Sequence, residues 1–388
     1  MLRFTVKYMS VRMGKNILIA LSIVVTLMVS LLSFNISNQV KDGVVGTYKY
    51  YDTIVGATGS QTQLVLNTMF YTDKAPGLIP YEIYENLIDD TRVSVAIPFA
   101  EGDNYNNARI IGTHSEYLNE YTLVEGRVFN EIFEVVLGYN IARNKGLGLG
   151  DTFYSVHGLT SDINSHEHKT EDKRYTVVGI LAKTNTSADN VIFTDIESVW
   201  ETHETEVHDD EEHMITAVLL KCVSFNAQNS ISMEYNKLSG IQAVNPSEVM
   251  RELLSSIDLT KNIVYVLCGI ILVMNLFIIS VITMLYMYDV KKDIIMLRLI
   301  GVSKGKIESI VYLQTLIISV VSSLLGFSLS RVLIRVAGSI TASRGIVLNT
   351  YRLYSAEFII LVAVILITFL PVILSVKNTL KGALVDES

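Results

Sequence analysis

The sequence predicts a membrane protein with four transmembrane α-helices and a large α+β extracytoplasmic domain between the first and second helices. Half of the 388 residues are apolar and only 18% are charged, whereas soluble proteins carry about 25% charged residues. Four stretches of roughly 18 or more residues contain almost no charge, which is the length needed to cross the hydrocarbon core of a bilayer. The segment between the first two stretches is polar and acidic.

The apolar stretches also divide the chain. Residues 1–36 form a basic cytoplasmic segment with the first helix (Ile17–Phe34), residues 37–260 form the outer domain, and residues 261–388 hold the other three helices. Those helices are expected at about 263–288, 310–329 and 358–376, with a cytoplasmic segment at 289–309. A cleaved signal peptide is the alternative for the first stretch, but its apolar core exceeds the ~7–15 residues of a signal peptide and no A-x-A-like site follows it.

Basic residues predict the orientation. The chain before the first stretch and the segment 289–309 are both rich in Lys and Arg, so the positive-inside rule places both, and the two termini, in the cytoplasm. The basic residues concerned are Arg3, Lys7, Arg12, Lys15, Lys291, Lys292, Arg298, Lys304 and Lys306. Residues 37–260 then lie on the outer, extracytoplasmic side of the membrane. They hold 15 basic and 33 acidic residues, which disfavours nucleic-acid binding.

The outer domain shows mixed secondary-structure patterns, which predict an α+β class with a mixed sheet. Strands are expected at Arg92–Phe99, Ala108–Gly112, Glu134–Leu137, Tyr175–Leu181, Val191–Phe193 and Ile215–Lys221. Helices are expected at Pro80–Ile88, Asn226–Leu238 and Pro246–Ile257. Near the first span, we interpret Gly46, Gly56 and Gly59 as points of flexibility and Tyr48, Tyr50 and Tyr51 as aromatic side chains at the membrane surface.

The sequence contains no motif for an energy source or a catalytic site. There is no G-x-x-x-x-G-K-[ST] phosphate-binding loop: the segment GVSKGKI at 301–307 has its glycines one residue too close and Ile307 in place of the Ser or Thr. No nucleophile, base and orienting residue form a recognisable set. The sequence therefore predicts a non-catalytic chain, with any ATP hydrolysis on another subunit.

One cytoplasmic motif indicates a family. Lys291-Lys292-Asp293-Ile294, followed by Leu297-Arg298, Gly301, Ser303 and Ile307, resembles the segment between the second and third spans of MacB/FtsX-type ABC transporter permeases. Asp293, Leu299 and Val302 depart from the usual Glu, Ala and Ala. The order of parts is also similar, including a proline late in the fourth span, Pro371.

The outer segment is similar to a narrower branch of permeases in this family with a histidine-containing outer domain. The similar stretches are 55–57, 59–60, 63–66, 97–98, 102–105, 109–113, 125–127, 148–151, 157–158 and 177–181, with Trp200 and His203. The resemblance thus extends over nearly the whole chain.

The resemblance implies a permease of the bacterial cytoplasmic (inner) membrane that forms a homodimer or heterodimer and pairs with two copies of an ABC ATPase. It would turn ATP-driven closure of the ATPases into movement of the outer domain. Export or extraction of a substrate would follow, with an extracytoplasmic adapter or binding protein as a candidate partner. The segment 289–309 would contact the ATPase, with Ile294, Leu297 and Ile300 on one helical face and the basic residues outside it. The alternative for this segment is a plain positive-inside anchor.

Two other functions remain open at this stage. One is an FtsX-like transmitter that moves no substrate and activates an extracytoplasmic partner. The other is a membrane-anchored metal-binding receptor with no ATPase.

Histidines form a second candidate site, for zinc or another divalent metal. Imidazole and carboxylate groups together suit such ions, and six histidines fall within 157–213 among many acidic residues: His157, His166, His168, His203, His208 and His213. His157, His168 and His203 coincide with the histidine pattern of the similar branch. His208 and His213 belong to the run ETHETEVHDDEEH at 201–213. The alternative is a solvated polar loop with incidental histidines.

Overall fold

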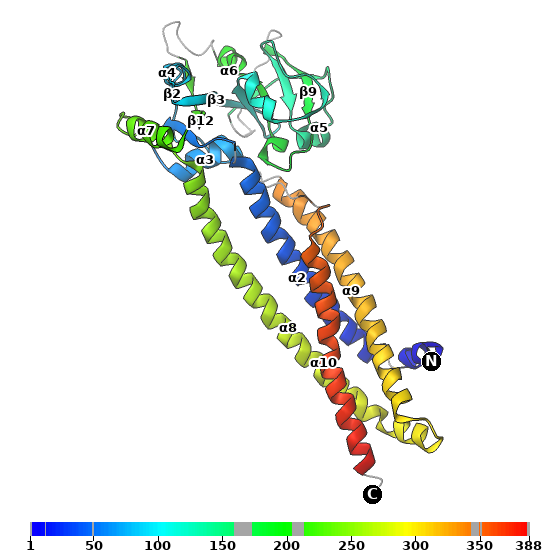
Figure 1. Ribbon diagram of the computed structural model, residues 1–388. Coiled ribbons are helices and arrows are strands. Elements are labelled where there is room, and N and C mark those ends of the chain that lie inside the picture. The colour runs from blue at the N-terminus through cyan, green and yellow to red at the C-terminus, as the bar shows by residue number, and fades with distance from the viewer. Residues whose placement is uncertain are drawn as a thin grey trace. The chain divides into compact units, whose positions relative to one another are not determined.

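A computed structural model describes residues 2–11, 13–48, 50–158, 173–203, 213–342, 349 and 351–385 (Figure 1). The chain divides into two compact units, which are described separately. The helical unit contains Met1–Asn38, Ile257–Gly338 and Asn349–Ser388, and the sheet unit contains Gln39–Ser256 and Ser339–Leu348.

Long apolar helices make up the helical unit, and the four predicted spans are confirmed. The helices of this part of the chain are α1 (Leu2–Val11), α2 (Met13–Tyr48), α8 (Pro246–Leu299), α9 (Lys304–Ala342) and α10 (Ser355–Val385). Helices long and apolar enough to cross a membrane occur at Met13–Gln39, Tyr265–Asp289, Lys304–Gly338 and Ser355–Lys377. At most 39% of each apolar window is buried inside the protein, so most of this surface is available to lipid.

The core of the helical unit forms around α2. Ile23, Leu27 and Leu31 of α2 are at most 1% exposed and pack with residues of α8, α9 and α10. Gly326 of α9 allows a close approach, because a Cβ there would lie 3.0 Å from the Val24 carbonyl oxygen. Small residues at such crossings are typical of membrane helices.

Helix α8 is longer than the sequence patterns indicate. The helix predicted at Pro246–Ile257 and the second span are one continuous helix of 54 residues. The polar residues 258–262 suggest a boundary, but they include neither glycine nor proline, and polarity alone does not end a helix.

The sheet unit is built on a mixed sheet with the strand order β13-β1-β12-β3-β4-β10-β6-β9-β5, with β7 paired to β9 and β8 paired to β3. The pairs β4/β10 and β6/β9 are parallel, which confirms the mixed sheet. The strands are β1 (Thr53–Ala57), β3 (Val93–Tyr105), β4 (Ala108–Thr113), β5 (Leu123–Gly126), β6 (Glu134–Leu137), β7 (Thr152–Phe153), β8 (Val156–His157), β9 (Tyr175–Leu181), β10 (Ile192–Asp195), β12 (Ala217–Cys222) and β13 (Ile241–Val244). A second, two-stranded sheet pairs β2 (Ile79–Pro80) with β11 (Met214–Ile215).

Short helices pack against this sheet. They are α3 (Gln61–Phe70), α4 (Glu82–Ile88), α5 (Tyr139–Lys145), α6 (Ile196–His203) and α7 (Phe225–Tyr235). Each of the six predicted strand segments overlaps an observed strand, and the helices predicted at Pro80–Ile88 and Asn226–Leu238 correspond to α4 and α7 within a few residues. Strand β3 continues six residues beyond the predicted end at Phe99.

Two interpretations of residues near the first span were wrong. Gly56 lies within β1, where a Cβ would come 2.6 Å from Leu64 Cδ1 of α3, so it permits close helix packing and is not a flexible joint. Tyr51 is 8% exposed and its ring stacks on Tyr117 at 6.1 Å. It therefore belongs to the core of the sheet unit and not to an aromatic belt.

Candidate functional site

The predicted coupling segment contains a tight turn between α8 and α9. Gly301 has a φ of +85°, a left-handed conformation that glycine adopts at low steric cost and that often follows a helix end. The Ser303 carbonyl accepts the backbone N–H groups of Lys306 and Ile307 at 3.0 and 3.4 Å, which begins α9. Two of the predicted site residues, Gly301 and Ser303, therefore form the turn itself.

Three apolar side chains are exposed at this turn. Met296, Leu299 and Ile300 are 67%, 79% and 76% exposed, and their spacing of i, i+3 and i+4 places them on one helical stripe. We call these three residues the turn patch. Of these three, the sequence pattern placed only Ile300 on the predicted contact face, although the same spacing could have added Met296 and Leu299.

The remaining predicted coupling residues cannot be compared in the same way. The backbone of α8 continues through them, but their side chains lie outside the described part of the structure: Lys291, Lys292, Asp293, Ile294, Leu297 and Arg298.

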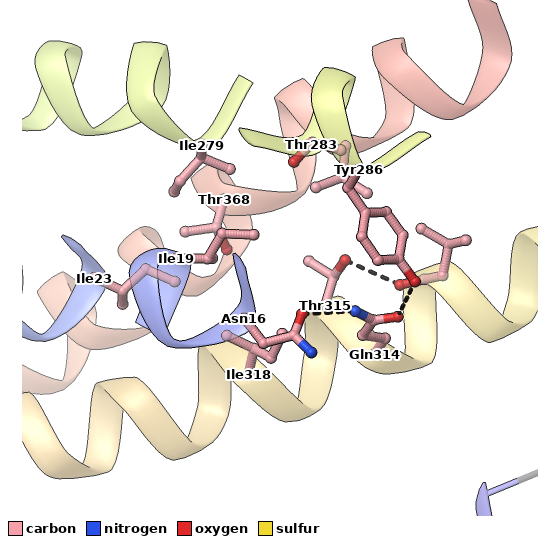
Figure 2. Close-up of a pocket in the computed structure, with 12 residues that line it drawn as sticks. Asn16, Ile19, Ile23, Ile279, Thr283, Tyr286, Gln314, Thr315, Ile318 and Thr368 are labelled. Carbon is pink, nitrogen blue, oxygen red and sulfur yellow. Dashed lines mark hydrogen bonds between the residues drawn. The ribbon is translucent and has the colours of Figure 1, made fainter. Parts of the chain in front are cut away.

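A chain of polar side chains joins the helices inside the helical unit (Figure 2). The Gln314 Nε2 atom donates to Asn16 Oδ1 at 2.8 Å, and the Tyr286 hydroxyl donates to Gln314 Oε1 at 2.9 Å. Asn16 Nδ2 in turn donates to the Met9 carbonyl at 3.0 Å. Asn16, Tyr286 and Gln314 are each at most 8% exposed, so this polar chain connects α1, α2, α8 and α9 within the bundle.

Two further polar contacts connect α2 with α8. Asn275 Nδ2 donates to the Ser22 carbonyl and lies within hydrogen-bond distance of Thr26 Oγ1, both at 2.6 Å. Lys15 and Asp289 form an ion pair. Because water does not compete inside a bilayer, side chains of this kind normally face one another within the bundle.

A small cavity lies beside the polar chain and is lined in part by Thr283, Thr315 and Thr368 (Figure 2). Its volume available to the centres of water molecules is ≈ 30 Å³, enough for about two waters. The Thr283 hydroxyl is buried and has no hydrogen-bond partner among the described residues. The cavity can hydrate this hydroxyl, but it is too small for an organic substrate.

Sequence reasoning missed the polar chain. Asn16, Asn275 and Gln314 are single amides in strongly apolar sequence, and their partners come from helices far apart in the chain. The available signal was the amide itself, because a polar residue within a span usually faces the bundle interior.

The predicted histidine site is only partly described. His157 is an exposed residue of β8, and its Nδ1 lies 4.0 Å from Oδ1 of the buried Asp103. His213 is exposed and stacks on Trp200 at 4.3 Å. His166, His168 and His208 lie outside the described residues, as does the side chain of His203.

Among the side chains that are described, no group of three or more His, Cys, Asp or Glu residues could hold a metal ion. A metal site in the outer domain therefore stays a prediction.

One buried carboxyl group in the sheet unit has unusual electrostatics. Glu101 Oε2 accepts hydrogen bonds from Asn67 at 2.8 Å and from Arg109 at 3.3 Å. Its Oε1 atom is buried and has no hydrogen-bond partner in the part of the chain that the structure describes. Burial raises the pKa of Glu101 to about 7, and the nearby Arg109 opposes this shift. The stability of the sheet unit should therefore depend on pH near neutrality.

Comparison with known proteins gives matches to two domain families and to solved structures, among them the two that follow. Residues 17–233 match the MacB-like periplasmic core domain, and residues 265–383 match the FtsX-like permease C-terminal domain. The periplasmic region of MacB from Actinobacillus actinomycetemcomitans is similar at 12% identity over 55% of this chain and 97% of that one, with a TM-score of 0.37. The extracellular domain of the noncanonic ABC-type transporter YknZ from Gram-positive bacteria is similar at 14% identity over 50% of this chain and 100% of that one, with a TM-score of 0.32. No curated protein matches the chain.

Proposed function

The chain belongs to the MacB/FtsX-type ABC transporter permeases, and from this premise we propose that it couples ATP hydrolysis on a separate ATPase chain to movement of its outer domain. The movement exports a substrate or extracts it from the membrane. The chain itself is a non-catalytic permease subunit, and ATP binds only to its partner.

The turn patch is the observation that carries this proposal. Leu299 and Ile300 are more than three-quarters exposed at a position ten residues beyond the end of the second span. An exposed apolar stripe flanked by basic residues is suited to insertion into a groove on another protein. The ATPase is the partner that this family supplies.

The bundle interior supports a lever in preference to a pore. The buried amides of the polar chain are hydrogen-bonded to one another, and the cavity beside them has room for only about two waters. A conduit for a substrate would require polar groups that face a larger aqueous space.

The assembly proposed is a dimer of permeases, identical or different, with two ATPase copies. Both termini and the α8–α9 turn face the cytoplasm, and residues 37–260 are extracytoplasmic, as the positive-inside rule indicates. An adapter or binding protein on the outer side, and zinc or another divalent ion in the outer domain, are further proposed partners.

Co-purification with an ABC ATPase tests the coupling role. Leu299→Glu and Ile300→Glu place a charge in the apolar contact and should reduce ATPase retention at least tenfold, since an unpaired charge at such an interface costs more than about 1.4 kcal/mol. Leu238→Glu is the matched control, because Leu238 is a 46% exposed leucine of the sheet unit. Full retention by both turn variants would contradict the proposed coupling contact.

Two alternatives make different predictions in the same preparation. A regulatory transmitter retains the ATPase but moves no substrate, and its activity appears in an extracytoplasmic partner. A metal-binding receptor retains no ATPase at all.

A further inference from the structure

Two buried acceptor atoms belong to a hydrogen-bonded pair of side chains between α3 and β3. Asn67 Nδ2 donates to Glu101 Oε2 at 2.8 Å and to the Asp73 carbonyl at 3.4 Å. The other oxygen of each side chain, Asn67 Oδ1 and Glu101 Oε1, is buried and has no hydrogen-bond partner among the described residues. Two buried acceptors without a donor are costly to the folded state.

The surroundings of the Asn67 amide fix its orientation. If the amide were turned over, its oxygen would face the Asp73 carbonyl and Glu101 Oε2, which are both acceptors. Exchanging the amide atoms therefore does not supply the missing donor. A proton on Glu101 does supply it, because a carboxylic acid and a primary amide can each donate one hydrogen bond to the other.

The packing around Glu101 favours the protonated form. Glu101 lies on the face of β3 that carries Ile97 and Phe99, which pack in one core cluster with α3, whereas α4 and α6 pack on the opposite face. Burial raises the pKa of Glu101 to about 7. Arg109 of the neighbouring strand β4 opposes this shift, but it contacts only the Oε2 atom at 3.3 Å.

The other titratable groups of this region were considered element by element. Burial raises the pKa of the tyrosines in the same core cluster, so they are neutral near pH 7: Tyr51, Tyr71, Tyr117 and Tyr121. On β8, which also pairs with β3, His157 lies 4.0 Å from Asp103. Asp73 and Lys74, after the end of α3, are exposed to solvent, where water screens their charges.

The amide of Asn67 also holds the chain that follows α3. We call residues 72–75 the α3 turn. Asp73 has a φ of +64°, an uncommon conformation for a residue with a side chain. Its carbonyl accepts from Asn67, and the Lys74 carbonyl accepts from Gln63 Nε2 at 2.9 Å. An amide that is held by Glu101 therefore connects β3 to the α3 turn.

We propose that Glu101 and Asn67 form a proton-binding site, in which the protonated carboxyl donates to Asn67 Oδ1 while Asn67 Nδ2 donates to Glu101 Oε2. We call this pair the proton site. Release of the proton to solvent leaves two acceptor oxygens facing each other, which weakens the hold of Asn67 on the α3 turn. In the proposed orientation, the outer domain thus responds to the acidity of the extracytoplasmic solution. This inference goes beyond the proposed function and does not depend on the ATPase.

Hydrogen–deuterium exchange of the purified full-length protein tests the proton site at about pH 5.5 and about pH 8.5, on either side of the pKa of Glu101. Exchange times are scaled for the intrinsic effect of pH on amide exchange. Opening of the α3 turn exposes Glu101 to water and returns its pKa toward 4.5, so the open form becomes more populated as the pH rises. Peptides that cover the α3 turn should exchange at least roughly tenfold faster at the higher pH.

Three variants separate the proton site from simple burial of a carboxyl group. Glu101→Gln can make both hydrogen bonds with Asn67 at any pH, so its α3 turn should stay protected at both pH values. Asn67→Leu keeps the carboxyl buried but removes the pairing, so its α3 turn should exchange fast at both. Glu85→Gln is the matched control, because Glu85 is an exposed glutamate of α4, and it should keep the pH dependence. The glutamine variant at 101 decides the test if Asn67→Leu fails to fold.

Any of four results would overturn the proton site. They are equal exchange of the α3 turn at both pH values, an equal acceleration in peptides that cover α7, a pH dependence that survives in Glu101→Gln, and a full pH dependence in Asn67→Leu. Protection that follows the sodium concentration in place of the pH would also overturn it, because the two oxygens would then bind a cation and not a proton.

Discussion

Replacing Gln314 tests whether the polar chain holds the bundle together. Gln314 is 5% exposed and joins Asn16 of α2 to Tyr286 of α8 through two side-chain hydrogen bonds. The variant Gln314→Leu keeps a similar volume and removes both bonds. Asn16 Oδ1 and the Tyr286 hydroxyl then lose these partners inside an apolar bundle.

The expected loss follows from the two bonds removed. Hydrogen bonds between membrane helices contribute about 0.6 kcal/mol on average and up to about 1.7 kcal/mol. Gln314→Leu should therefore lower the free energy of unfolding by about 1–3 kcal/mol. In a double-mutant cycle with Tyr286→Phe, the interaction energy of that pair alone should be about 0.6–1.7 kcal/mol.

The assay is reversible unfolding of the full-length protein in mixed detergent micelles, with the four members of the cycle compared. Ser328→Ala is the control partner for Tyr286→Phe, because the Ser328 hydroxyl donates to the Leu324 carbonyl of its own helix at 2.8 Å. That control cycle should be additive. An interaction energy near zero for Gln314 and Tyr286 would refute the polar chain as an interhelical connection.

Three other predictions concern the sheet unit. Burial raises the pKa of Glu101 from 4.5 to about 7, so the folded protein binds this proton more tightly than the unfolded chain does. The resulting stabilisation is complete below about pH 4.5 and is lost as the pH rises through 7. The free energy of unfolding should therefore fall by about 3 kcal/mol across that window. Glu101→Gln should remove this fall in thermal unfolding measured at several pH values, and an unchanged pH profile would count against it. Gly126→Ala should lower the free energy of unfolding by more than about 2 kcal/mol, because Gly126 has a φ of +78° and a Cβ there would lie 2.1 Å from the Val178 carbonyl oxygen. Gly146→Ala should lower it by only about 1–2 kcal/mol, because Gly146 has a φ of +67° but open space around it. Equal melting temperatures of the two variants would contradict this prediction. His157→Ala combined with His203→Ala should weaken zinc binding in calorimetry, and an unchanged isotherm would exclude these two histidines as ligands.

The sequence predicts the membrane spans well because hydropathy over some 20 residues is a strong signal. The spans expected at Ile263–Tyr288 and Phe358–Val376 agree with those found to within a few residues. Strands with β-branched runs, such as Tyr175–Leu181, are predicted to the residue. Strand β1 and helix α3 were not predicted because the glycines at 56 and 59 suggest a loop. The structure explains Gly56, because the Leu64 side chain of α3 packs against β1 where a Cβ would lie.

The candidate site is less predictable than the fold. Gly301 and Ser303 were found because a turn requires particular residues at particular positions. The exposure of Met296 and Leu299 depends on which face of α8 the other helices cover, and this is a property of tertiary packing. The ion pair of Arg331 with Glu357 could not be predicted for a similar reason: Arg331 and Arg335 look equivalent in sequence, and only the packing of α10 against α9 brings Glu357 to Arg331.

The energetics of the polar contacts suit a bundle that changes its packing. Three side-chain contacts connect α2, α8 and α9, namely Asn16 with Gln314, Gln314 with Tyr286, and Asn275 with Thr26. At about 0.6 kcal/mol each, they total about 2 kcal/mol, which corresponds to a shift of roughly twentyfold between two arrangements. That is enough to favour one packing at rest, and little enough for the proposed ATPase contact to reverse it. The cavity beside the contacts has room for water, which could take the hydrogen bonds that a moving helix releases and so lower the cost further.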